Sequence, residues 1–130
     1  MSDKVQYWVD IAEYDLETAR AMLETKRYLY VGFMCHQVIE KMLKGHYAQQ
    51  RQETPPYTHN LKYLAQESGL LELMSQDQRA FLNRLLPLNV EARYPEEKDK
   101  LLHVLGRDRC QQILQSTEEL RAWIREKLSI

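Results

Sequence analysis

The polar residues best placed for chemistry include a ridge of four in the chain's most apolar stretch. Gln37, Glu40, Lys41 and Lys44 recur at intervals of three and four residues. On a helix this spacing aligns the four side chains on one face. Two lysines that a neighbouring carboxylate holds in position are suited to binding a phosphate group. The alternative is that the four residues form a solvent-exposed edge of the helix, as charged residues on helices usually do.

A single carboxylate interrupts the apolar face of the preceding segment. At 100° per residue, Asp15 falls in the middle of that face, between Ile11 and Met22. An unpaired buried carboxylate would cost several kcal/mol, so we expect a cationic or hydrogen-bonding partner for it. The sequence therefore predicts that Asp15 meets the basic ridge of the next helix and forms a polar cleft inside the fold.

Two further candidates lie near proline-containing loops. His59 follows Pro55 and Pro56 at the expected start of a helix, where it can serve as a ligand or general base, or only as a helix cap. Arg93 stands beside Tyr94, which offers a two-pronged phosphate contact next to a stacking surface. The alternative for Arg93 is a loop anchor paired with a helix acid such as Asp15.

Several chemistries lack their motifs in this chain. None of the four histidines stands in an HExxH or a CxxC-type spacing, so we predict no metal site. There is no glycine-rich phosphate loop and no GxSxG nucleophile motif. We expect no cofactor.

Composition restricts the class of protein. The 130 residues suit a single domain spanning 1–130, and 44% apolar with 28% charged residues is typical of a globular chain. Eighteen basic against 19 acidic residues give a net charge of −1, which excludes a strongly basic nucleic-acid coat. Cys35 and Cys110 are too few for a disulfide scaffold. With no export-type leader and no apolar run near the roughly 20 residues of a membrane span, we expect a cytoplasmic protein.

These residues must be positioned by helices, because glycine and proline are scarce and apolar residues recur with helical spacing. Asn89 to Asp99 is expected to be irregular because Pro95 favours an extended Tyr94. The second helix is apolar on most sides, so we expect it to be central and covered by neighbours or by a second subunit. The fold class is all-α, an up-and-down bundle of four or five helices. The expected helices run from about Asp3 to Lys26, from Tyr28 to Gln50, from Thr58 as cap to Gly69, from a Ser75–Gln78 capping box to Pro87, and from Gly106 to Leu128.

The chain resembles the HEPN domain family (higher eukaryotes and prokaryotes nucleotide-binding), in the branch that carries Arg-Tyr-Pro. The likeness extends from about Gln6 to Lys127. The residues that carry it are Trp8, Ala12, Asp15-Leu16 and Ala19, then Gln37, Glu40-Lys41 and Leu43-Lys44, then Thr58-His59-Asn60-Leu61, and finally Ala92-Arg93-Tyr94-Pro95.

This resemblance implies a helical bundle that forms a homodimer and works beside a minimal nucleotidyltransferase in a two-component system of toxin–antitoxin type. Some HEPN proteins are metal-independent RNases whose signature is an arginine, four to six residues and a histidine. None of the histidines here has that spacing. Arg51 and His59 come closest, with seven residues between them, two of which are prolines.

Three functions follow as hypotheses. The leading one is a dimeric binding module that holds a nucleotide or other phosphate-bearing ligand, with Asp15, Gln37 and Glu40 as a structural polar network. The ligand-binding residues would be Lys41, Lys44, His59, Arg93 and Tyr94. The alternative is an RNase toxin in which His59 is the general base and Arg93 stabilises the phosphorane. The third is a structural helper whose polar ridge is only an internal salt-bridge network. The second helix and the loop around Tyr57 are the candidate dimer faces.

Overall fold

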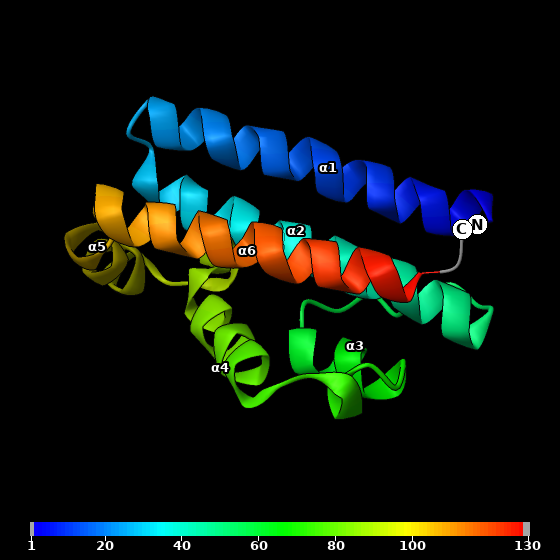
Figure 1. Cartoon of the computed structure of the whole chain (residues 1–130). Coiled ribbons are helices and arrows are strands. Elements are labelled where there is room, and N and C mark those ends of the chain that lie inside the picture. The colour runs from blue at the N-terminus through cyan, green and yellow to red at the C-terminus, as the bar shows by residue number, and fades with distance from the viewer. Residues whose placement is uncertain (1, 129–130) are drawn as a thin grey trace.

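The computed structural model describes residues 2–128, and in that part of the chain every regular element is helical (Figure 1). This confirms the all-α fold class. The α-helices are α1 (Asp3–Glu24), α2 (Tyr28–Arg51), α3 (Leu61–Glu67), α4 (Gln76–Leu85), α5 (Pro95–Val104) and α6 (Arg107–Lys127). Three single turns of 3₁₀ helix join them: η1 (Leu71–Leu73), η2 (Leu86–Leu88) and η3 (Val90–Ala92).

Helix α2 is the centre of the molecule. The long helices α1 and α6 run beside it, while the shorter α3, α4 and α5 lie along the other side (Figure 1). Its apolar sides are covered by the chain's own helices, so α2 is not a free dimer face. A close approach of α1 is possible because position 45 is glycine, where an added Cβ would lie 3.3 Å from the Cβ of Trp8.

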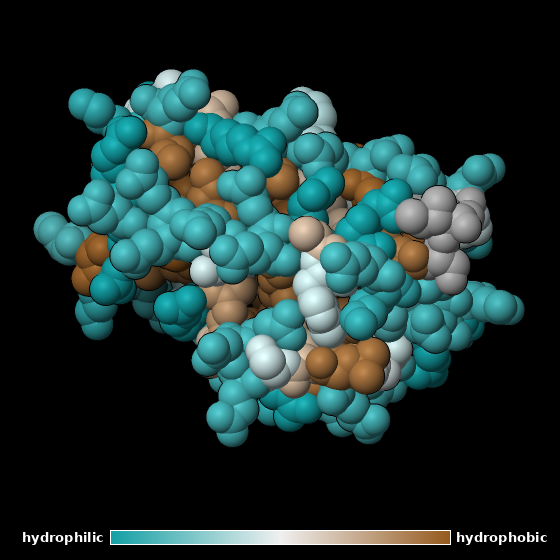
Figure 2. Space-filling view, viewed as in Figure 1, coloured by the Kyte–Doolittle hydropathy of each residue, from teal (hydrophilic) through white to brown (hydrophobic). Residues whose placement is uncertain are grey.

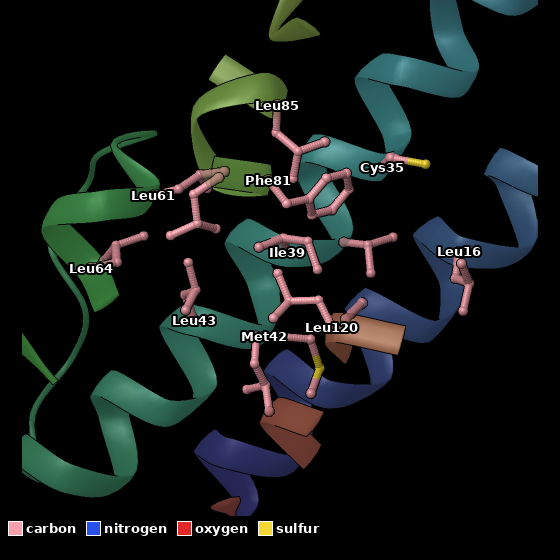
Figure 3. Close-up of a cluster of buried hydrophobic side chains, with 14 of the residues drawn as sticks. Leu16, Cys35, Ile39, Met42, Leu43, Leu61, Leu64, Phe81, Leu85 and Leu120 are labelled. Carbon is pink, nitrogen blue, oxygen red and sulfur yellow. The ribbon is translucent and has the colours of Figure 1, made fainter. Parts of the chain in front are cut away.

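The buried side chains of the core come mainly from five helices, α1, α2, α3, α4 and α6 (Figure 3). Ile39, Met42 and Leu43 of α2 are completely buried, and Leu16 of α1 and Leu120 of α6 close one side of the cluster. Leu64 of α3 and Leu85 of α4 add the other side. Each such side chain stabilises the fold by about 1.5–3 kcal/mol. Within the described residues, no helix has both the length and the apolar character to span a membrane.

The helix starts follow the expected capping chemistry with one correction. The Ser75–Gln78 capping box is present and opens α4. Helix α3, however, is capped by Asn60 and not by Thr58: the Asn60 side chain accepts from the backbone N–H of Tyr63. The Thr58 hydroxyl accepts from the backbone N–H of Asn60 instead. Thr58 therefore shapes the approach to the helix.

The expectation of an irregular stretch from Asn89 to Asp99 is wrong in its second half. Tyr94 is extended, with φ −73° and ψ 158°, as its position before a proline requires. Pro95 then begins α5, because proline at the first helical position gives up a hydrogen bond that the helix does not need there. The sequence Arg93-Tyr94-Pro95 thus serves as a helix entrance.

Candidate functional site

A buried carboxylate forms the centre of the polar residues on α2. The side chain of Glu40 is 2% exposed, and its Oε1 lies 2.8 Å from Nδ1 of His59, at the entry to α3. Its Oε2 accepts a hydrogen bond from Nζ of Lys44 at 3.2 Å. Nζ of Lys41 lies 3.9 Å from the same oxygen. One carboxylate therefore organises three basic side chains.

Asp15 of α1 joins this group from the neighbouring helix. Its Oδ2 lies 3.9 Å from Nζ of Lys41, which confirms the predicted meeting of the two helices through opposite charges. Burial raises the pKa of Asp15 above its usual 3.8; Lys41 opposes that shift and the negative charge of Glu40 adds to it. Lys41 is thus shared between two carboxylates, and its charge is matched inside the protein.

Lys44 is enclosed in the same way. Its side chain is 8% exposed. Its Nζ lies 5.6 Å from the ring centre of Trp8 on α1 and 5.9 Å from that of Tyr57 in the loop before α3. The Tyr57 ring also meets the ring of His59 edge to face at 6.2 Å. An ammonium group held by a carboxylate and two aromatic faces is well stabilised, and it has little freedom to reach a ligand.

The structure adds a residue that the sequence did not single out. His36 is fully buried on α2, with Nδ1 at 3.2 Å from Oε1 of Gln37 and 3.9 Å from Oε1 of Glu40. Burial lowers the pKa of His36 below its usual 6.5 and keeps the ring neutral at pH 7. The sequence feature that could have identified His36 is its spacing from Glu40, because residues four apart on a helix lie on the same face. Gln37 contacts His36, so it supports the buried side of the network.

Arg93 is held separately from the lysines. Its Nη2 donates to the backbone oxygen of Leu86 at 2.9 Å, and its Nη1 lies 3.8 Å from Oε2 of Glu97. The alternative for Arg93, a loop anchor paired with a helix acid, is therefore confirmed, but the acid is Glu97 of α5 and not Asp15. Tyr94 has a different environment, since this residue is 75% exposed.

His59 and Arg93 nevertheless face one cavity. It measures about 340 Å³ and lies where the start of α3 meets α4 and the turns η2 and η3. Three asparagines and one further lysine contribute polar groups to its wall: Asn60, Asn83, Asn89 and Lys62. Lys41, Lys44 and Tyr94 are not among the lining residues. Of the five predicted ligand-binding residues, the structure brings two to this cavity.

The electrostatics explain what the cavity can attract. Behind it, the charges of Asp15 and Glu40 are matched by those of Lys41 and Lys44. Positive charge at the wall comes instead from the guanidinium of Arg93 and from Lys62. Arg51, the nearest arginine before His59 in sequence, is engaged with Glu53 and Glu67. Within residues 2–128, no three His, Cys, Asp or Glu side chains gather in a metal-ligating group.

Comparison with known proteins identifies the family. The profile of the HEPN domain matches residues 5–127, so the chain belongs to the HEPN domain family. The crystal structure of TT1696 from Thermus thermophilus has a similar fold, with a TM-score of 0.77 and 20% sequence identity. The superposition covers 98% of this chain and 100% of that one. No curated protein matches the chain in sequence.

Proposed function

We propose that this HEPN domain is a binding module for a nucleotide or other phosphate-bearing ligand, held in the cavity that His59 and Arg93 share. The observation that carries the proposal is this pairing of an arginine and a carboxylate-backed histidine at one cavity wall. A carboxylate behind the ring fixes its orientation. A cavity of about 340 Å³ also falls within the size range of small-molecule sites.

The residues take different roles in this proposal. Arg93 contacts the phosphate oxygens through its guanidinium, and the ring of His59 faces the ligand with Nε2, the nitrogen that Glu40 leaves free. Tyr94 does not line the cavity but is exposed next to Arg93 in the chain, and in this proposal it supplies the stacking surface for a base that extends out of the cavity. Lys41 and Lys44 are positioning residues here, because both are engaged by carboxylates and neither lines the cavity. With Asp15, Gln37 and Glu40 they hold His59 in place.

The partners belong to the same proposal. We propose that the protein acts as a homodimer and as one half of a toxin–antitoxin-like pair with a minimal nucleotidyltransferase, whose chemistry requires a nucleotide. A cytoplasmic location is consistent with Cys35 and Cys110, which are free thiols and buried.

Calorimetric titration with ATP, AMP and inorganic phosphate tests the ligand. We expect heat of binding with the wild type and a loss of about tenfold or more in affinity for Arg93→Ala and His59→Gln, because each removes a polar contact to the phosphate. Arg79→Ala is the matched control, since Nη2 of Arg79 also donates to a backbone oxygen, that of Leu71, on another part of the surface. No heat with any of the three ligands, or equal affinity in all variants, would overturn the proposal.

The alternative is a metal-independent RNase at the same cavity. The Glu40–His59 contact favours it, because a carboxylate on one ring nitrogen orients the other as a general base. His59 would take the proton of a ribose 2′-hydroxyl as its oxygen attacks phosphorus, and Arg93 would stabilise the charge that develops. His59 would then return the proton to the departing 5′-oxygen. Incubation of RNA in EDTA, comparing wild type with Arg93→Ala and Arg79→Ala, decides between cleavage and binding alone.

A further inference from the structure

A buried asparagine lines the phosphate cavity proposed above. Figure 2 shows that hydrophilic side chains cover most of one face of the molecule, where water solvates them. Asn89 is different, because it is 6% exposed and yet belongs to the wall of the cavity of about 340 Å³. A polar side chain that is buried to this extent normally has a hydrogen-bond partner.

The amide of Asn89 has no such partner among the described residues. Asn89 connects η2 to η3 and is the N-cap of η3, a position where an asparagine side chain usually accepts a hydrogen bond from the helix. Here its side chain makes no cap hydrogen bond, and it makes no other hydrogen bond within residues 2–128. Both amide atoms keep some contact with solvent-accessible space. The amide is therefore free to bind what enters the cavity.

Asn60, in the same wall, shows by contrast how an asparagine serves the fold. Its Oδ1 accepts from the backbone N–H of Tyr63 at 3.0 Å and caps α3. The burial of the Asn89 amide costs free energy that no partner in the described chain returns. Proteins break such rules of stability mainly at functional sites. The environment of Asn89 is therefore that of a side chain that contacts a ligand.

The chemistry of an amide indicates which part of a ligand it meets. The oxygens of an ionised phosphate only accept hydrogen bonds, so they suit Arg93 and Lys62, whose side chains only donate. The amide of Asn89 both donates and accepts, and a hydroxyl group does the same. A sugar also presents carbon atoms, for which the cavity has an apolar wall formed by Leu61, Leu82, Leu86 and Ala92.

The order of groups in a nucleotide fits this division of the cavity. Ribose joins the phosphate to the base, and its 2′- and 3′-hydroxyls lie on the edge of the ring that carries neither of them. In the proposed function the phosphate is on Arg93 and the base stacks on Tyr94, which is exposed outside the cavity. The hydroxyl edge of the ribose is then the part that enters the cavity and reaches Asn89.

We propose that Asn89 is a specificity-determining residue, whose buried amide binds the 2′- and 3′-hydroxyls of a ribonucleotide. This inference rests on the proposed function, whose ligand it narrows to a nucleotide with an intact ribose. A nucleotide that lacks these hydroxyls leaves the amide unpaired in the complex, and a site built to bind a hydroxyl group rejects such an analogue.

Calorimetric titration with AMP, 2′,3′-dideoxy-AMP and inorganic phosphate tests this inference. The wild type is expected to bind AMP about tenfold or more tightly than the dideoxy analogue. Asn89→Ala should bring the ratio of the two affinities close to one by weakening the binding of AMP. Gln112→Ala is the matched control and should keep the ratio, because Gln112 carries the same amide group but is exposed on α6 and does not line the cavity.

Urea unfolding of Asn89→Ala and Asn60→Ala separates a role in binding from a role in folding. Asn60→Ala removes the cap of α3. Asn89→Ala removes an amide that makes no hydrogen bond with a described residue, so its midpoint of unfolding should fall less. A loss as large as that of Asn60→Ala would mean that the amide serves the fold and would overturn the inference.

The outcomes of the titrations distinguish this inference from the proposed function. Equal affinity of the wild type for AMP and the dideoxy analogue overturns the inference and leaves the phosphate site in place. An Asn89→Ala variant that keeps the wild-type ratio assigns the hydroxyls to another residue and overturns it too. A variant that weakens both nucleotides equally places the amide on the base or the phosphate, with the same consequence. No heat with AMP or inorganic phosphate overturns the proposed function itself.

Discussion

Replacing Glu40 with glutamine should strongly destabilise the fold, because it removes the negative charge from the middle of the buried network. Lys44, with a side chain 8% exposed, keeps its ammonium group but loses its counter-charge. Breaking a buried ion pair by removing one partner costs about 3–5 kcal/mol. His59 adds less, since its side chain is 50% exposed and water can replace the lost contact. Against a typical total stability of about 5–15 kcal/mol, this is a large fraction.

A double-mutant cycle isolates the charge effect from packing. Lys44→Met keeps most of the side-chain volume without the charge, so Glu40→Gln combined with Lys44→Met should be more stable than Glu40→Gln alone. Urea unfolding followed by circular dichroism at pH 7 gives each free energy of unfolding. Glu91→Gln is the control, because Glu91 is exposed and forms no ion pair with a described residue. The effect of this control should stay within about 0.5 kcal/mol.

Two results would refute this reasoning. A loss below about 1 kcal/mol for Glu40→Gln would mean that Lys44 is solvated in spite of its enclosure. Additive losses in the double variant would mean that the two side chains act independently, and that the contact at 3.2 Å contributes nothing to stability.

The remaining predictions concern titration, reactivity and capping. Burial raises the pKa of Asp15 above 3.8, so the folded protein binds the proton of this carboxyl more tightly than the unfolded chain does. The contribution of Asp15 to stability is therefore fully present below pH 3.8 and is lost as the pH rises through the raised pKa. The stability of the wild type relative to Asp15→Asn should therefore fall as the pH rises through that window, and a constant difference in urea titrations would argue against it. Burial lowers the pKa values of His36 and His46 from 6.5, so their contribution is present above pH 6.5 and lost as the pH falls through the lowered values. His46→Gln should reduce the loss of stability between about pH 7 and pH 5, whereas the exposed control His103→Gln should not. Burial also raises the pKa of the Cys35 thiol to about 12 and that of Cys110 to about 11, so both should react with a thiol reagent only after unfolding; rapid reaction of the native protein would contradict this. Asn60→Ala should lower stability by about 1 kcal/mol through loss of the α3 cap, and an unchanged melting temperature would show that the cap is dispensable.

The sequence predicted the long helices well, because the apolar periodicity that indicates a helix depends only on residues within that helix. The apolar stripes of α1, α2 and α6 repeat over many turns, so their bounds were predicted to within a few residues. The cap of α3 was misplaced by two residues because both Thr58 and Asn60 can cap, and only the backbone geometry decides between them. Helix α5 was missed because only Leu101 of its apolar residues packs against the core, so the segment gives little amphipathic pattern.

The functional site also has features that the sequence predicted and features that it did not. A carboxylate on an apolar face requires a partner wherever it is buried, so the sequence was sufficient to predict that Asp15 meets the basic ridge of α2. The sequence was not sufficient to predict which lysines are free to contact a ligand. Lys41 and Lys44 were expected at the ligand, yet both are enclosed by groups from other segments.

The sequence by itself determined the helical fold and the need for a buried ion-pair network, because helical periodicity and the desolvation of charge act on every chain in the same way. Only the tertiary structure decided that Arg93, from the turn before α5, faces the same cavity as His59, from the loop before α3. Thirty-three residues separate the two in the chain, at positions 60–92. No motif in the sequence predicts that these two side chains are close in space, because their closeness arises from the packing of α3 and α4 against α2.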